Sequence, residues 1–276
     1  MSKGKKNDRK DKERKKRIKK TIIEWVVVIG IVLFLRSFFV ESFLIPTGSM
    51  EDTYFPGDLI VVNKFKYGLK VPFRLQKIFY KRMPRRGEII AFVAPFEPEK
   101  PYPPENYIRI LFPKFIPLLP LWWDKQNKRI IFYAPKNLIK RCIAVAGDTV
   151  EVRNKVLYIN GKRQEDDYAQ HKDYRLIPGL VLPKQEYQRK WENREFKEEE
   201  IVRDNFGPVV VPEDCFFAMG DNRDFSYDSR YWGAVPYDYL IGTPLFIYFS
   251  LGGHGGILQR IFNIRWNRIG RLMNRE

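Results

Sequence analysis

Histidine is nearly absent from this chain, because its 276 residues include only His171 and His254. Neither has a second histidine three or four positions away, so no zinc-type ligand spacing is present, and we expect no metal ion and no other cofactor. A serine hydrolase with a histidine base would have to recruit one of these two residues. The base for a nucleophilic serine is therefore sought among other side chains.

Cysteine is equally rare, with only Cys142 and Cys215, so the chain has no disulfide framework. The two thiols can pair if their domain lies outside the cytosol, but burial as free thiols is the simpler interpretation. Hydrophobic residues make up 44% of the sequence and charged residues 30%, which predicts a folded chain rather than a disordered one.

Negative charge is scarce at both ends of the chain, where most of the net charge of +17 is found. Residues 1–20 hold twelve Lys or Arg and three Asp or Glu, and residues 251–276 hold five Arg and one Glu. The first basic cluster precedes an apolar run, which favours an anionic lipid surface as partner. The part between the ends has no basic stripe with interleaved aromatic residues, so we expect no nucleic acid.

One long apolar run, TIIEWVVVIGIVLFLRSFFV, occupies residues 21–40. As a helix it would be close to the thickness of a bilayer core, which is about 30 Å. No Ala-x-Ala site follows it, so it resembles an uncleaved anchor more than a signal peptide. The basic residues before it predict a single pass through the cytoplasmic membrane, with residues 1–20 inside and the rest outside.

The remaining sequence predicts a mainly β domain over residues 41–250. Five runs of β-branched or aromatic residues are bounded by Gly, Pro, Asp or Asn, and Asn160-Gly161 is a strong hairpin signal. The five predicted strand regions are 58–65, 87–95, 138–148, 149–162 and 206–221.

Three segments do not fit the strand pattern. Residues 96–135 are rich in Pro, Leu and Trp, and we expect an insertion whose Trp122 and Trp123 either line a core or contact the lipid interface. Residues 163–204 are charged and helix-permissive, as in a surface insertion. The tail 251–276 has apolar residues at near-helical spacing, which predicts a short amphipathic helix that either packs on its own domain or lies on lipid.

Three short stretches carry candidate chemistry. In PTGSM, Gly48 leaves room for a substrate beside Ser49, and the Thr47 hydroxyl and the Ser49 N–H can face a developing oxyanion; a plain surface turn is the alternative. In NLIKRCIAVAGD, burial of Lys140 would lower its pKa enough for it to act as a base, and the cation of Arg141 would act in the same direction. The alternative is a lysine that reaches solvent from a strand edge.

The third stretch, residues 218–236, has the sequence AMGDNRDFSYDSRYWGAVP and packs several Asp and Arg residues into a short loop. This density suggests a buried ion network, in which the Ser226 hydroxyl can orient an amine. A solvated charged loop is the alternative.

In this order, PTGSM with TYFPGD, then KFKYGLKVPF, RRGEIIAF, IKRCIAVAGD and MGDNRDFSYDSRYWGAVP resemble the motifs of bacterial type I signal peptidases. These are membrane-anchored serine endopeptidases that remove signal peptides of the Ala-x-Ala type from exported preproteins. The resemblance covers nearly all of the chain after the basic tail. It implies a catalytic domain of coiled antiparallel β-sheets with a variable insertion, preceded by one transmembrane helix.

The resemblance also implies roles for single residues. Ser49 would be the nucleophile and Lys140 the general base, and segments 43–48 and 136–139 would bind the substrate as an added strand. Thr47 and the Ser49 N–H would form the oxyanion hole, and Ser226 would orient the lysine. Asp228 and Arg230 with Arg141 would form an ion pair, and Asp221 and Arg223 would be structural. The substrate path would be lined by Phe43, Leu44, Ile45, Pro46, Met50, Leu138 and Ile139.

The sequence departs from this family in two places. Glu51-Asp52 follows Ser49-Met50 where the family often has Pro, and the segment 96–135 is long. Two other classes of protein were weighed. A self-cleaving Ser-Lys regulator would carry a DNA-binding segment in place of an anchor, and an inactive membrane scaffold would be expected to lack Ser49 or Lys140.

Overall fold

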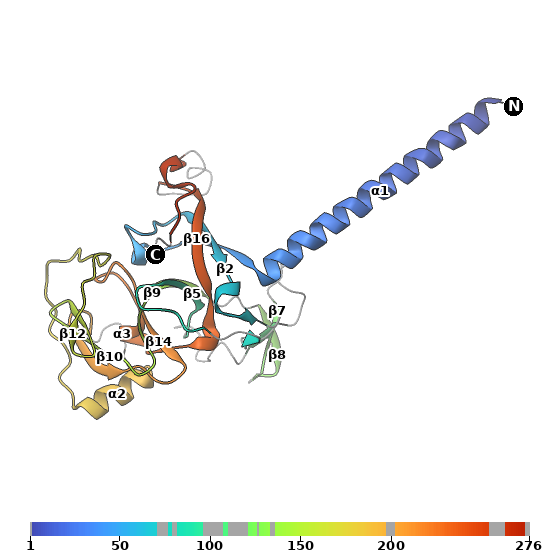
Figure 1. Ribbon diagram of the computed structural model, residues 1–276. Coiled ribbons are helices and arrows are strands. Elements are labelled where there is room, and N and C mark those ends of the chain that lie inside the picture. The colour runs from blue at the N-terminus through green and yellow to red at the C-terminus, as the bar shows by residue number, and fades with distance from the viewer. Residues whose placement is uncertain are drawn as a thin grey trace.

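The strands that carry the sequence motifs form one curled, seven-stranded antiparallel sheet (Figure 1). The computed structural model describes residues 2–70, 77–78, 82–95, 107–109, 121–125, 127–132, 136–196, 202–253 and 263–273. The strand order in the large sheet is β1 (Val40–Leu44), β2 (Asp58–Asn63), β16 (Leu240–Ser250), β5 (Ile89–Val93), β9 (Asn137–Val145), β14 (Cys215–Met219) and β15 (Val235–Pro236).

Burial along these strands follows their position in the sheet. β2 alternates buried and partly buried residues, whereas all of β5 is buried, so both faces of the sheet are covered at this strand. The core continues through aromatic contacts, for example between Phe92 of β5 and both Phe216 and Trp232. Cys142 and Cys215 are free thiols, and Cys142 is buried.

A second, four-stranded sheet stands beside the first. Its order is β12 (Lys162–Arg163), β11 (Val156–Ile159), β10 (Thr149–Arg153) and β13 (Phe206–Val210). Asn160 and Gly161 both have positive φ between β11 and β12, as the hairpin prediction requires. The helix α2 (Lys184–Glu192) confirms a helical element within 163–204 and covers this sheet through Tyr187 and Trp191, which pack on Phe206.

The described parts of the predicted insertion 96–135 form a separate antiparallel sheet of β6 (Tyr107–Arg109), β7 (Leu121–Asp124) and β8 (Arg129–Phe132). The side chain of Trp122 lies outside the described residues, and Trp123 is partly exposed. A further pair, β3 (Leu69–Lys70) and β4 (Lys77–Ile78), completes the described strands.

The N-terminal helix α1 (Ser2–Phe38) extends away from the β-rich part of the molecule (Figure 1). It includes residues 21–38 of the predicted anchor, and β1 begins at Val40. Within the residues that the structure describes, no helix combines the length and apolar character needed to cross a bilayer.

The prediction of an amphipathic helix in the tail is wrong for residues 263–273. This segment has a single 3-10 turn, η5 (Trp266–Arg268), and runs along β16, with bridges from Phe246 to Leu272 and from Leu251 to Ile264. The backbone N–H of Ile247 donates to Arg271, and that of Met273 donates to Leu245. The main-chain groups of the tail are thus satisfied by the sheet rather than by helical bonds, so this part packs on its own domain. The predicted helix positions Leu258 and Phe262 lie outside the described residues.

Two arginines of the tail reach a carboxylate that is completely buried. Asp58, at the start of β2, accepts bonds from Arg268 at 2.6 and 3.1 Å, from Arg265 at 3.4 Å and from the Ser250 hydroxyl at 2.6 Å. Arg268 also donates to the carbonyl of Thr53 at 3.1 Å. The tail therefore holds the loop that leads from Ser49 to β2.

Replacing Arg268 with Met removes its bonds to Asp58 and leaves Arg265 as the remaining cation. We expect the free energy of unfolding to fall by about 3 kcal/mol, the magnitude typical of a broken buried ion pair. Urea unfolding of the full chain, followed by tryptophan fluorescence, measures this change. Arg271→Met, at an exposed residue, is the control and is expected to change the free energy by less than about 0.5 kcal/mol.

The same variant also changes the pH dependence of stability. Burial alone would raise the pKa of Asp58, but hydrogen bonds, first of all from Arg268, hold it below its usual value. Asp58 thus contributes stability above its unfolded pKa, and the contribution is lost as pH falls through its folded pKa. In Arg268→Met the folded pKa rises, so the acid unfolding midpoint is expected at higher pH. An unchanged midpoint would contradict this role.

Candidate active site

Ser49 lies in a single 3-10 turn, η1 (Gly48–Met50), which is docked on the loop that follows β14. Its carbonyl accepts the N–H of Asn222 at 3.2 Å. The next residue, Met50, is buried, and its sulfur accepts the N–H of Asp221 at 3.4 Å. The turn that carries the candidate nucleophile is thus fixed by a loop about 170 residues away in the sequence, as the separation of Met50 and Asp221 shows.

Lys140 lies in β9, where it is paired with Ile90 of β5. Its side chain is 2% exposed, so it is buried and does not reach solvent as the alternative interpretation supposed. Its Nζ lies 3.0 Å from the Oγ of Ser226. The predicted contact between these two residues, 86 positions apart, is present.

Burial lowers the pKa of Lys140 to about 8, because desolvation disfavours the charged ammonium. The Asp228 carboxylate acts in the opposite direction, and the Arg230 guanidinium acts in the same direction as burial. The effects of these two neighbours on the pKa of Lys140 have opposite signs, and desolvation is the largest cause of the shift. The cation that helps to lower the pKa is therefore Arg230 and not the sequence neighbour Arg141.

Asp228 and Arg230, the two charged neighbours just named, form a completely buried ion pair with each other. Two nitrogens of Arg230 donate to the two carboxylate oxygens of Asp228, at 2.9 and 2.8 Å. Asp228 also caps the short helix α3 (Ser229–Trp232) and accepts the N–H of Gly220 at 3.2 Å. Both charges are thus satisfied by several bonds, as buried charges require.

Arg141 is not part of that pair, which corrects the sequence prediction. It donates instead to both carboxylate oxygens of Asp221, at 2.8 and 2.6 Å, and its guanidinium lies over the ring of Tyr168. Side chains of neighbouring strand residues point to opposite faces, so Arg141 and Lys140 make different hydrogen bonds, to Asp221 and to Ser226. Asp221 also accepts the Thr53 hydroxyl at 2.6 Å, which ties the loop after Ser49 to this second pair.

Gly220 brings the two halves of the site together. A Cβ built on it would lie 2.4 Å from the Ser226 Oγ and 2.4 Å from the Ser49 carbonyl oxygen. Both groups therefore occupy the space that a side chain would fill, and Ser49 lies near the hydroxyl that contacts Lys140. The sequence analysis missed this residue, although a glycine directly before the Asp-Asn-Arg-Asp run was a readable signal.

The other predicted site residues differ in their exposure. The Thr47 hydroxyl is 3.5 Å from the Ser49 Oγ and is exposed. Ile45 and Met50 are buried, whereas Leu44 is exposed. The remaining residues of the predicted substrate path are Phe43, Leu138 and Ile139, which are partly buried, and Pro46, which is exposed. Within the described ranges, no cluster of His, Cys, Asp or Glu has a metal-binding arrangement.

Comparisons with known proteins show the family of this chain. The family described as "Signal peptidase, peptidase S26" matches residues 18–249. The chain belongs to the peptidase S26 family. Members of this family are serine endopeptidases, so this chain is one too, and the resemblance to bacterial type I signal peptidases is confirmed.

Several relatives are similar over most of their length. A signal peptidase I of Buchnera aphidicola subsp. Baizongia pistaciae is 34% identical, with 91% of this chain and 83% of that protein covered. One of Haemophilus influenzae is 34% identical, with coverages of 81% and 67%, and one of Helicobacter pylori is 27% identical, with 89% of each. A crystal structure of a signal peptidase I from Enterococcus faecalis is 24% identical, covers 59% of this chain and 97% of that chain, and has a TM-score of 0.31.

The space around Gly220 makes a direct prediction for this S26 peptidase. Gly220→Ala would push Ser226 and the Ser49 turn apart, and a displacement of about 1 Å at a catalytic group can cost about 100-fold in rate. We expect kcat to fall by about that factor, measured on a precursor protein. Gly30→Ala, whose added Cβ meets nothing within 4 Å, is the control. Activity close to wild type in Gly220→Ala would show that Ser49 and Ser226 need not lie so close.

Proposed function

We propose that this chain removes N-terminal signal peptides from exported preproteins at the outer face of the cytoplasmic membrane, with Ser49 as nucleophile and Lys140 as general base. The observation that carries the proposal is the buried Lys140 amine, 3.0 Å from Ser226 and with a pKa lowered to about 8. A neutral amine in this position can accept the Ser49 proton as the hydroxyl attacks a peptide carbonyl.

The reaction then follows the chemistry of acyl transfer. The Thr47 hydroxyl and the Ser49 N–H stabilise the oxyanion, and the Lys140 ammonium returns its proton to the departing amine. This gives an acyl-enzyme on Ser49, which water hydrolyses after Lys140 has removed its proton. Ser226 acts as an acceptor that keeps the Lys140 amine directed at the serine in both steps.

Two strand edges support a substrate bound as an added strand. β1 is the last strand of the large sheet and pairs only with β2 in the described sheet order. β14 pairs with β9 only from Arg141 to Val145, which leaves that edge of residues 137–140 available. A signal peptide can therefore hydrogen-bond to both edges as it approaches Ser49, and small residues before the cut fit beside Leu44 and Ile139.

The membrane location rests on the sequence. We propose that residues 21–40 anchor the chain, with the basic residues 1–20 inside and the catalytic domain 41–250 outside. Their hydropathy and the preceding positive charge support this topology, and α1 continues through the run to Phe38. An exported precursor would meet the site close to the surface from which it emerges.

Cleavage of an exported precursor with an Ala-x-Ala site tests the dyad. The full chain in detergent is expected to cut after the last Ala, and Ser49→Ala and Lys140→Ala are each expected to lose at least about 1000-fold in kcat, since each removes an essential group. Mass spectrometry of the new N-terminus gives the position of the cut. Cleavage that survives Lys140→Ala would identify another base, and no cleavage of several precursors by the folded wild type would favour an inactive scaffold.

The pH dependence tests the role of Lys140 separately. Only the neutral amine accepts a proton, and its neutral fraction increases as pH rises through a pKa of about 8. We expect kcat/KM to rise about tenfold per pH unit below that value and to level off above it. A profile that is flat between pH 6 and 9 would contradict a lysine base. An exposed-lysine variant, Lys162→Gln, is expected to keep the wild-type profile.

A further inference from the structure

Two acidic residues follow the nucleophile turn directly, and neither has a role in the chemistry described above. The carboxylate of Glu51 folds back over the turn, because its Oε2 would lie 3.5 Å from a Cβ on Gly48. The Nδ2 of Asn222 contacts both the Gly48 carbonyl, at 3.3 Å, and Glu51 Oε2, at 3.5 Å. The Oδ1 of the same amide is buried with no hydrogen-bond partner among the described residues. Glu51 is thus held next to Ser49.

A lysine from a distant segment pairs with these acids. The Nζ of Lys172 lies 2.9 Å from Glu51 and 3.7 Å from Asp52. Each of the three side chains keeps at least a third of its surface exposed. The group carries two negative charges and one positive charge, so its net charge is about −1 at neutral pH, beside the candidate nucleophile.

The backbone on both sides of Lys172 is fixed, so this pairing is built into the fold. Gln170 forms a parallel bridge with Asn222, and its N–H donates to the Asp221 carbonyl at 2.7 Å. On the other side, the N–H of Asp173 donates to the Asp224 carboxylate at 2.8 Å.

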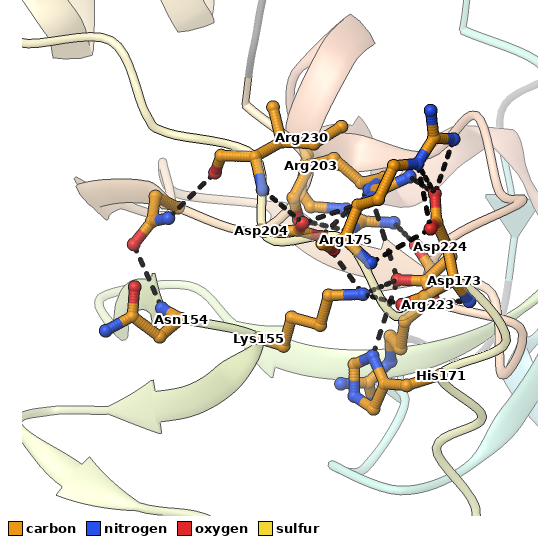
Figure 2. A network of polar contacts seen from close by, with 12 residues as sticks. Asn154, Lys155, His171, Asp173, Arg175, Arg203, Asp204, Arg223, Asp224 and Arg230 are labelled. Carbon is orange, nitrogen blue, oxygen red and sulfur yellow. Dashed lines mark hydrogen bonds and ion pairs between the residues drawn. The ribbon is translucent and has the colours of Figure 1, made fainter.

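Further ion pairs hold the segment that carries Lys172 in place. Figure 2 shows Asp173 and Asp224 within a network of arginines and Lys155, in which Arg203 binds Asp173 at 2.9 Å and Lys155 binds Asp224 at 3.0 Å. The segment is thereby pinned to the same loop that positions Ser49, and Lys172 has little freedom to move away from Glu51.

The direction of the two proposed substrate edges places this charged group on the side of the cut that becomes the mature protein. Residues 43–48 directly precede Ser49, and residues 137–139 directly precede Lys140, so in the proposed binding mode both edges hold the part of the substrate on one side of the cut. A chain that follows these edges with its signal peptide must continue past Ser49 in the other direction. Glu51 and Asp52 directly follow the Ser49 turn and pair with Lys172, so in this binding mode these three charged groups lie beside that exit.

We propose that Glu51, Asp52 and Lys172 together select the first residues of the mature chain, favouring basic over acidic side chains there. This proposal rests on the proposed function. The net negative charge attracts a lysine or arginine of the substrate, and Lys172 limits this preference by neutralising one of the two carboxylates. An acidic substrate residue is repelled by the carboxylate that remains.

The test uses precursors that are identical except for Lys or Glu at one of the first four positions after the cut. The wild-type chain is expected to cleave the Lys form with a kcat/KM about two- to fivefold higher than the Glu form at one or more of these positions, as for exposed charge pairs. The preference is expected to increase in Lys172→Gln and to fall towards one in Glu51→Gln and Asp52→Asn. Higher salt is expected to reduce it.

Lys162→Gln, an exposed lysine of the second sheet, is the matched control and is expected to keep the wild-type preference. A Lys-to-Glu ratio near one at all four positions in the wild type, or an unchanged ratio in all three site variants, overturns the proposal. Because the readout is a ratio, a variant with lower overall activity still gives an answer. Failure of the proposed function gives a different result, namely no cleavage of either precursor form.

Discussion

The buried amine of Lys140 is the constraint on which the rest of the site depends. A lysine acts as a base near neutral pH only if it is removed from water, and removal from water is unfavourable for any charge left nearby. A lone carboxylate beside Lys140 would keep it protonated, because the ammonium and the carboxylate would stabilise each other. The pairing of Asp228 with Arg230 solves this problem, since it supplies a polar environment with almost no net charge.

This neutral pair also links several segments of the chain. Arg230 donates to the carbonyls of Arg203 and Arg223, both at 2.7 Å, and Asp228 accepts from Gly220. The segment 163–204, the loop that follows β14 and the end of β14 therefore meet at this buried ion pair. Arg141, which follows Lys140 in β9 and points to the other face of the sheet, forms a second ion pair with Asp221. Lys140 and Arg141 thus contact the loop after β14 through Ser226 and Asp221, and Asp221 in turn holds the loop after Ser49.

The sequence was sufficient for features that depend on local patterns. Bounded runs of β-branched and aromatic residues predicted the strands, the Asn160-Gly161 pair predicted its hairpin, and the order of the motifs predicted the family. It was insufficient where a side chain chooses among distant partners of equal chemistry. Arg141 had two acidic candidates, and only the pleat of β9 decides between them. The tail has helical spacing, but the part of β16 beyond its pairing with β5 and the buried Asp58 offer it better partners than a helix would.

The charges of this site differ in how strongly water affects them. Those around Lys140 are buried and paired, so dissolved ions screen them little and fixed geometry would set the proposed proton transfer. Those of Glu51, Asp52 and Lys172 are exposed and sensitive to salt, so they can favour one substrate over another without shifting the pKa of the base. This separation explains how a departure from the usual Pro, only two residues after Ser49, is compatible with the proposed dyad. In the proposed mechanism, the exposed charges of Glu51, Asp52 and Lys172 act on which chain is cut, whereas the buried groups act on how it is cut.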